Sequence, residues 1–215
     1  METNELANEL RNMLLRLASI NDCFLLHKKL LIYKTEMNTE MNIAPAFFQI
    51  VMYSLEHTYI VDLFKLYDRD KNAKGLRKAI NLCEQYSTIF PKERIMFRDT
   101  ERKRSEIVKI NVIKDIKGMK EKLDIIAPVV KCLQGRRNSY YAHADKAYID
   151  DILQLASDYP LSFKQIADLI QTANEILNTL LRDLCGEVVA KNSSNYDDVK
   201  NIFEILKAYK KIKMG

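Results

Sequence analysis

Residues 135–145 carry the side chains of this chain that are best suited to chemistry, in the order Gly-Arg-Arg-Asn-Ser-Tyr-Tyr-Ala-His-Ala-Asp. Arg137 is a fixed-charge fork that fits phosphate oxygens, and His143 can give or take a proton near neutral pH. Asn138 can hold an oxygen or orient the histidine. These types suffice for metal-free cleavage of RNA, because the 2′-hydroxyl attacks its own phosphate. By spacing alone they also fit the start of an ordinary surface helix.

The rest of the sequence offers few other groups for chemistry. The remaining histidines are His27 and His57, which we expect in the core or on helix surfaces, and the four cysteines are far apart in the sequence. There is no His-Glu-x-x-His, no P-loop and no Gly-rich dinucleotide turn. We therefore expect no metal and no cofactor. Widely spaced cysteines, an acidic N-terminus and no long apolar stretch favour a cytoplasmic protein with reduced thiols and no membrane association.

The net charge of +5 comes from one segment. Residues 91–122 contain 11 basic and 6 acidic side chains, whereas the flanking parts are balanced. Such a segment can attract RNA through its phosphates, or it can be a solvated face paired with Asp and Glu. Tyr140 and Tyr141 could stack on bases or pack against a neighbouring helix. The predicted RNA-binding residues are these tyrosines and the densest cations, Arg98, Arg102, Lys103 and Arg104.

Glycine and proline together make up only 9 of 215 residues, which is too few for the turns of a sheet-based fold. Apolar residues recur in steps of three and four, so the sequence predicts an all-α bundle. We expect Pro128 to kink one helix, Gly135 to break the chain, and Ser162 with Gln165 to cap another. The predicted helices cover about 3–33, 45–70, 75–90, 112–133, 138–157, 162–189 and 196–213. We expect one domain over 1–190, with the helix of 196–215 packed on it.

The segment Arg137-Asn138-x-x-x-Ala142-His143 resembles the signature of the HEPN superfamily. Its surroundings are similar to the AbiU branch, which is associated with abortive infection and phage defence. Residues 59–70 are similar to that branch's apolar helix and its Leu-x-Asp turn, and residues 160–170 to the capped helix after the motif. The resemblance implies a four-helix core and a homodimer whose two motifs form one cleft.

The resemblance also implies a metal-independent endoribonuclease that acts as a toxin or defence effector, with an antitoxin or defence partner. Arg137 would bind the scissile phosphate, His143 would be the general acid or base, and Asn138 would orient one of them. On a continuous α-helix Arg136 shares a face with His143 better than Arg137 does, so Arg136 is the second choice. Asp62, on an apolar helix face, needs a partner that the motif could supply. The alternative is a non-catalytic helical module that binds a protein or RNA.

Overall fold

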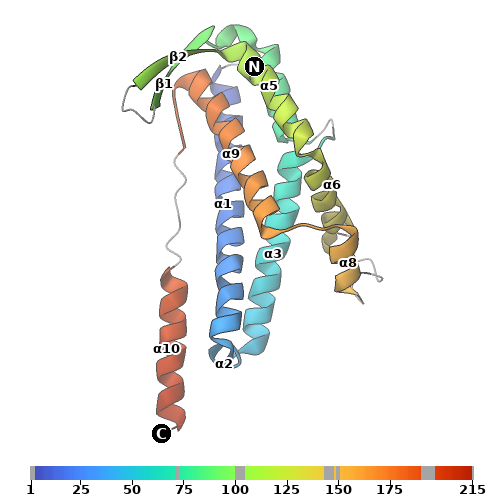
Figure 1. Ribbon diagram of the computed structural model, residues 1–215, viewed down its shortest axis with the longest axis vertical. Helices are drawn as coiled ribbons and strands as arrows, with labels where there is room; N and C mark the ends of the chain where they lie inside the picture. Colours follow the sequence, from blue (N-terminus) through green and yellow to red (C-terminus); the bar gives the residue numbers. More distant parts are fainter. Residues whose placement is uncertain are drawn as a thin grey trace. The chain divides into compact units, whose positions relative to one another are not determined.

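The computed structural model describes residues 3–70, 73–99, 105–142, 148, 151–189 and 197–214 (Figure 1). The chain forms two compact units, one from Met1–Leu17 with Leu63–Ala190 and the other from Ala18–Asp62 with Lys191–Gly215. The helices are α1 (Thr3–Glu36), α2 (Asn38–Met41), α3 (Pro45–Tyr67), α4 (Leu76–Gln85), the 3-10 turn η1 (Ser87–Ile89), α5 (Val112–Ile125), α6 (Ala127–Arg136), the π-helix η2 (Arg137–Ala142), α8 (Ile152–Asp158), α9 (Phe163–Cys185) and α10 (Asp197–Met214).

The predicted all-α fold is confirmed, because helices make up nearly all of the described chain. The predicted helix start at Ser162 is confirmed as well. The Ser162 side chain accepts from the backbone N–H of Gln165, and the Gln165 side chain accepts from the N–H of Ser162 at 2.8 Å. This reciprocal cap satisfies two helix N–H groups and places the apolar stripe of α9 inward.

The first unit is built around α9, whose inward face is buried against α4 and α5. Its apolar side chains supply most of the core of this unit, and they recur at helical spacing: Ile166, Leu169, Ile170, Ala173, Ile176, Leu177, Leu180 and Leu181. From α3, the hydroxyl of Tyr67 donates to the carbonyl of Leu169 at 2.5 Å. The C-terminal end of α3 is therefore held against α9.

An antiparallel hairpin that the sequence reasoning missed belongs to the same unit (Figure 1). Strand β1 (Glu93–Asp99) pairs with β2 (Ser105–Asn111), and β2 leads directly into α5. The Asn111 side chain accepts from the backbone N–H of Lys114 at 2.9 Å and caps that helix. The basic segment therefore begins as a β-ribbon and not as a helix.

Two predicted breaks differ from the structure. Pro128 does not kink a continuous helix, because α5 ends at Ile125 and Pro128 lies in the first turn of α6, where its missing N–H costs nothing. Gly135 does not break the chain either, since α6 continues through it to Arg136. A Cβ at position 135 would lie 2.1 Å from the ring of Tyr159. The glycine thus allows a close approach of an aromatic ring to the helix.

The second unit has a small aromatic core. Phe203 of α10 lies with its ring centroid 4.6 Å from that of Tyr33 and 5.4 Å from that of Phe48, and Leu30 and Met41 complete the cluster. Helix α10 also contacts α2. These contacts attach α10 to the second unit, and the prediction of one domain over 1–190 stays a prediction. Among the described residues, no helix combines the length and the apolar character that crossing a bilayer requires.

Candidate active site

The motif lies where α6 changes into a π-helix. Helix α6 ends at Arg136, and Arg137–Ala142 continue it with the wider i→i+5 turn. Arg137 keeps helical dihedral angles, with φ −57° and ψ −47°. The part of the motif from Arg137 to Ala142 therefore lies on helical backbone, and the change from α-helix to π-helix falls at Arg137.

The side chain of Arg136 has a structural partner. Its Nε donates to the backbone carbonyl of Tyr159 at 2.8 Å, and the Tyr159 ring packs against Gly135 one residue earlier. Tyr159 directly follows α8, in the segment that connects α8 to α9, and Arg136 gives its backbone carbonyl a hydrogen-bond donor. This contact holds α6 against the segment that connects α8 to α9, and a catalytic role for Arg136, the second choice, stays a prediction.

Arg137 has different surroundings. Its Nη1 donates to Oδ1 of Asn138 at 2.8 Å, and its guanidinium carbon lies 5.4 Å from the centroid of the Phe64 ring. Its Nε is buried and has no hydrogen-bond partner among the described residues. Asn138 and Phe64 hold this guanidinium in place. Its buried Nε–H remains unpaired within the described chain, which costs free energy and leaves a donor that a ligand could use.

The Arg137–Asn138 contact fixes the orientation of the amide as well. Because the Asn138 oxygen accepts from the guanidinium, the Asn138 NH₂ group points elsewhere and remains a donor. A fixed positive fork beside an amide donor can bind the oxygens of a phosphate. His143 lies outside the described residues, as do its neighbours up to position 147, so its placement relative to Arg137 stays a prediction.

The two tyrosines of the motif contact each other. Tyr140 and Tyr141 are half-buried, with ring centroids 5.0 Å apart in an edge-to-face arrangement. Asp62 is half-buried on α3. It lies close enough to Cys23 to affect that thiol, whose pKa is raised by burial and by the negative charges of Asp22 and Asp62. Base stacking by the tyrosines and support of the motif by Asp62 stay predictions.

Part of the basic segment is engaged in ion pairs. Arg94 of β1 donates to Asp183 of α9 at 2.6 Å and to Asp115 of α5 at 2.9 Å, and the Asp183 side chain is only 1% exposed. Lys120 pairs with Glu84 of α4. Arg94 and Lys120 therefore pair with acidic side chains, as the alternative to RNA binding predicts for this segment. The Arg94–Asp183 pair was missed because the partners are far apart in the sequence.

The cations predicted to bind RNA are described only in part. Arg98 lies on β1 opposite Glu106 in the strand register. Arg102, Lys103 and Arg104 lie outside the described residues. Lys114 and Lys117, which follow on α5, are exposed. Binding of RNA by this segment therefore stays a prediction.

A groove of about 820 Å³ adjoins the motif and was not predicted. It runs between the end of α3 and α6, and Phe64, the residue under the Arg137 guanidinium, is part of its wall. Its other lining residues are Tyr67, Asp68, Arg69, Asp70, Asp124, Ala127, Pro128, Val130, Lys131 and Gln134. Ala127, Lys131 and Gln134 follow at i, i+4 and i+7 along α6, a spacing that could have indicated a shared face. In the part of the chain that is described, no group of three or more His, Cys, Asp or Glu could hold a metal ion.

Comparison with known proteins identifies a family. The family model HEPN_AbiU2, described as AbiU2, matches residues 4–203, which is nearly the whole chain. No curated protein and no solved structure matches it. The matched range includes the motif, the groove beside it and the basic segment.

Proposed function

We propose that this chain, which belongs to the AbiU2 family of HEPN proteins, is a metal-independent endoribonuclease that cleaves RNA during abortive infection or as a toxin. Membership of this family indicates a role related to phage defence. The observation that carries the finer proposal is the contact between Arg137 and Asn138, which prepares a positive fork for a phosphate six residues before His143.

In this proposal the RNA supplies its own nucleophile. The 2′-oxygen forms a bond to the neighbouring phosphorus and loses its proton to a base, while the bond from phosphorus to the 5′-oxygen breaks and that oxygen gains a proton. The products are a 2′,3′-cyclic phosphate and a 5′-hydroxyl. Arg137 stabilises the charge on the phosphate oxygens, and His143 carries a proton in one of the two transfers. Asn138 keeps Arg137 in position.

The proposal includes a homodimer, because one Arg-His pair supplies few catalytic groups. Two motifs that face each other across an interface would supply twice as many in one cleft. A two-fold dimer would place the same residues of both copies in one cleft. Light scattering at micromolar concentration should give twice the mass of the chain. A strict monomer that cleaves RNA would contradict the composite site.

The test of the reaction is incubation of the purified chain with mixed RNA in the presence of a chelator. We expect cleavage to persist, the products to end in a 2′,3′-cyclic phosphate, and RNA without 2′-hydroxyls to resist. His143→Ala should lose about 10²- to 10⁴-fold in rate, as expected when a positioned acid or base is removed. His57→Ala is the matched control, because His57 lies on α3, far from the motif in sequence, and this variant should keep full activity.

Two outcomes would contradict the proposal. Full activity of His143→Ala would exclude the proton-transfer role. A folded chain that is inert on every RNA tried, but that still binds RNA or a partner protein, would instead favour the non-catalytic module.

A further inference from the structure

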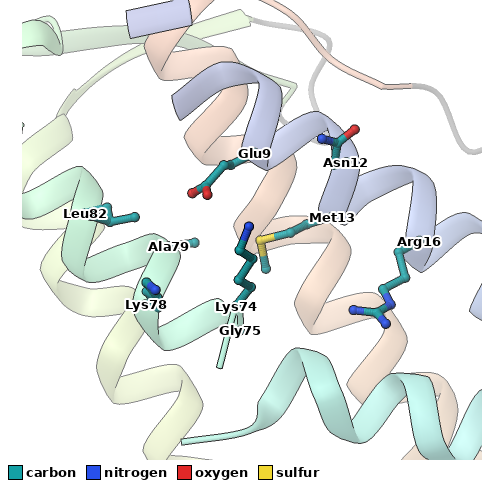
Figure 2. A pocket seen from close by; sticks show the side chains of 9 residues that line it. All are labelled: Glu9, Asn12, Met13, Arg16, Lys74, Gly75, Lys78, Ala79 and Leu82. Atoms are coloured by element: carbon teal, nitrogen blue, oxygen red, sulfur yellow. The ribbon is translucent and has the colours of Figure 1, made fainter. Parts of the chain in front are cut away.

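A small cavity in the first unit lies between α1 and the start of α4, and no motif residue lines it (Figure 2). Its volume is about 160 Å³. Each helix presents one face to it, with lining residues at i, i+3, i+4 and i+7. From α1 these are Glu9, Asn12, Met13 and Arg16, from α4 and its cap Gly75, Lys78, Ala79 and Leu82, and Lys74 precedes the helix.

The cavity has partly apolar walls, and its whole volume is close to that of one aromatic ring. Met13 and Leu82 are half-buried, and Ala79 and Gly75 are buried. A Cβ at Gly75 would lie 2.9 Å from the carbonyl oxygens of both Leu66 and Asp68, so glycine is required at this position of the lining. An apolar cavity of about 150 Å³ in another protein holds one benzene molecule. The space here therefore suits one aromatic ring or a branched alkyl group of that size.

The charges around this cavity are unequal. Three cations, Arg16, Lys74 and Lys78, line the cavity with a single carboxylate, Glu9. In Figure 2, Lys74 extends across the cavity toward α1, while Arg16 lies at the end away from Glu9. The structure records no ion pair for Lys74, Lys78 or Glu9 within the described ranges. Ammonium groups that line a cavity without a carboxylate partner create a positive potential that favours an anion.

We propose that this cavity binds a small organic oxyanion, namely an apolar group about one ring in size that carries a carboxylate or a phosphate. The apolar group packs on Met13, Ala79 and Leu82. The head group accepts charge-assisted hydrogen bonds from the ammonium groups of Lys74 and Lys78, which suit carboxylate and phosphate alike. This site is independent of the motif, and it stands whether or not the chain cleaves RNA.

The first experiment compares three probes with the full-length chain by calorimetry. Phenyl phosphate and benzoate carry the ring and the charge, and benzyl alcohol carries the ring alone. We expect both anions to bind, and the tighter one identifies the head group. Benzyl alcohol should bind about tenfold more weakly or not at all, because it lacks charge-assisted hydrogen bonds. Binding of benzyl alcohol as tight as that of the anions, or no binding of either anion, would overturn the proposal.

Variants then test the position of the site. Asn12→Trp covers the cavity from its exposed rim without a change of charge and should abolish binding. Lys74→Gln with Lys78→Gln should weaken binding of the better anion about tenfold. Glu9→Gln should strengthen it about threefold, since the only like charge is removed. The charge-matched control is Lys114→Gln with Lys117→Gln on exposed positions of α5.

The control variant should leave anion binding unchanged, and circular dichroism should show that every variant is folded. Equal weakening by the control pair would show that the anions respond to net charge only, and would overturn the proposal. So would binding that survives Asn12→Trp, because the anion would then lie elsewhere.

Discussion

Arg136 and Arg137 are neighbours in sequence, yet their guanidinium groups have unlike partners. Arg136 donates to the backbone carbonyl of Tyr159, whereas Arg137 donates to the Asn138 side chain and lies over the Phe64 ring. The Arg136 guanidinium is engaged with the backbone of the segment that leads to α9, whereas the Arg137 guanidinium has only a neighbouring side chain and a ring as partners among the described residues. This difference favours Arg137 as the proposed phosphate-binding residue, and the choice between the two stays a prediction.

The first prediction separates these two roles. Arg136→Ala should lower the free energy of unfolding by about 1 kcal/mol, since a part-buried hydrogen bond is lost. Arg137→Ala loses a hydrogen bond to the adjacent Asn138 but also removes a buried Nε that lacks a partner in the described part of the chain, so its effect on unfolding should be smaller, while RNA cleavage should fall much further than in Arg136→Ala. Urea denaturation and cleavage rates measured on the same samples check this. A more severe loss of cleavage in Arg136→Ala would reverse the assignment.

The second prediction concerns the contact of Gly135 with Tyr159. Gly135→Ala should destabilise the chain by about 1–3 kcal/mol, because the new methyl group would displace the ring. In a Tyr159→Ala background the same change should stabilise it by up to about 1 kcal/mol, since alanine favours a helix. A double-mutant cycle from urea denaturation measures the difference. Additive effects would show that the ring moves away without cost.

The third prediction concerns the ion pair of Arg94 and Asp183. Asp183→Asn should cost about 3 kcal/mol of unfolding free energy, because it removes one partner of a pair whose carboxylate is 1% exposed. Glu204→Gln on α10 is the matched control. It breaks an exposed i,i+4 pair with Lys200 and should change the unfolding free energy by no more than about 0.5 kcal/mol. Equal effects of both substitutions would show that the buried pair contributes no more than a surface pair.

The fourth prediction is a pH dependence of stability. Burial lowers the pKa of His27, opposed by the charge of Glu56, and a ring nitrogen of His27 lies 3.1 Å from the hydroxyl of Tyr59. Below about pH 6.5 the unfolded chain therefore binds a proton that the folded chain does not, so stability falls as the pH falls. Unfolding free energies measured between pH 7.5 and 5 should show a shallower decline for His27→Gln. The control His57→Gln should keep the slope of the wild type.

The fifth prediction tests the basic segment. Neutralisation of Arg102, Lys103 and Arg104 to glutamine should weaken RNA binding equally across sequences and reduce its dependence on salt, since phosphate contacts carry no base information. Filter binding at several salt concentrations measures both effects. The double variant of Lys114 and Lys117, which removes charge from α5, is the comparison. An unchanged affinity and salt slope in the triple variant would mean that these cations only face solvent.

Much of the fold follows from local signals in the sequence. The capping box at Ser162 and Gln165 and the start of α3 at Pro45 are both where their patterns predict, because such signals act within one turn of a helix. The hairpin was missed because its apolar runs are short, and short runs do not distinguish a strand from a helix. The role of Gly135 was misjudged for a different reason, since it depends on Tyr159, which lies elsewhere in the sequence.

The candidate site divides in the same way. The residue types of the motif could be recognised from the sequence, because Arg137 and Asn138 are adjacent and the chemistry of each side chain does not depend on the fold. The contact of the Arg137 guanidinium with the Phe64 ring could not, because Phe64 comes from another helix, α3. The contact of Arg136 with Tyr159, which follows α8, is equally hidden in the sequence. The groove beside Phe64 and the cavity at Met13 likewise arise only when helices distant in the sequence meet.

The π-helix of Arg137–Ala142 has a consequence for how this segment tolerates changes in length. A π-helix is an α-helical turn that has accepted one additional residue, so a deletion of one residue within it restores the ordinary turn and leaves α6 undisturbed. We therefore expect α6 to tolerate a deletion of one residue within Arg137–Ala142, although every residue after the deletion would turn by about 100° around the helix axis.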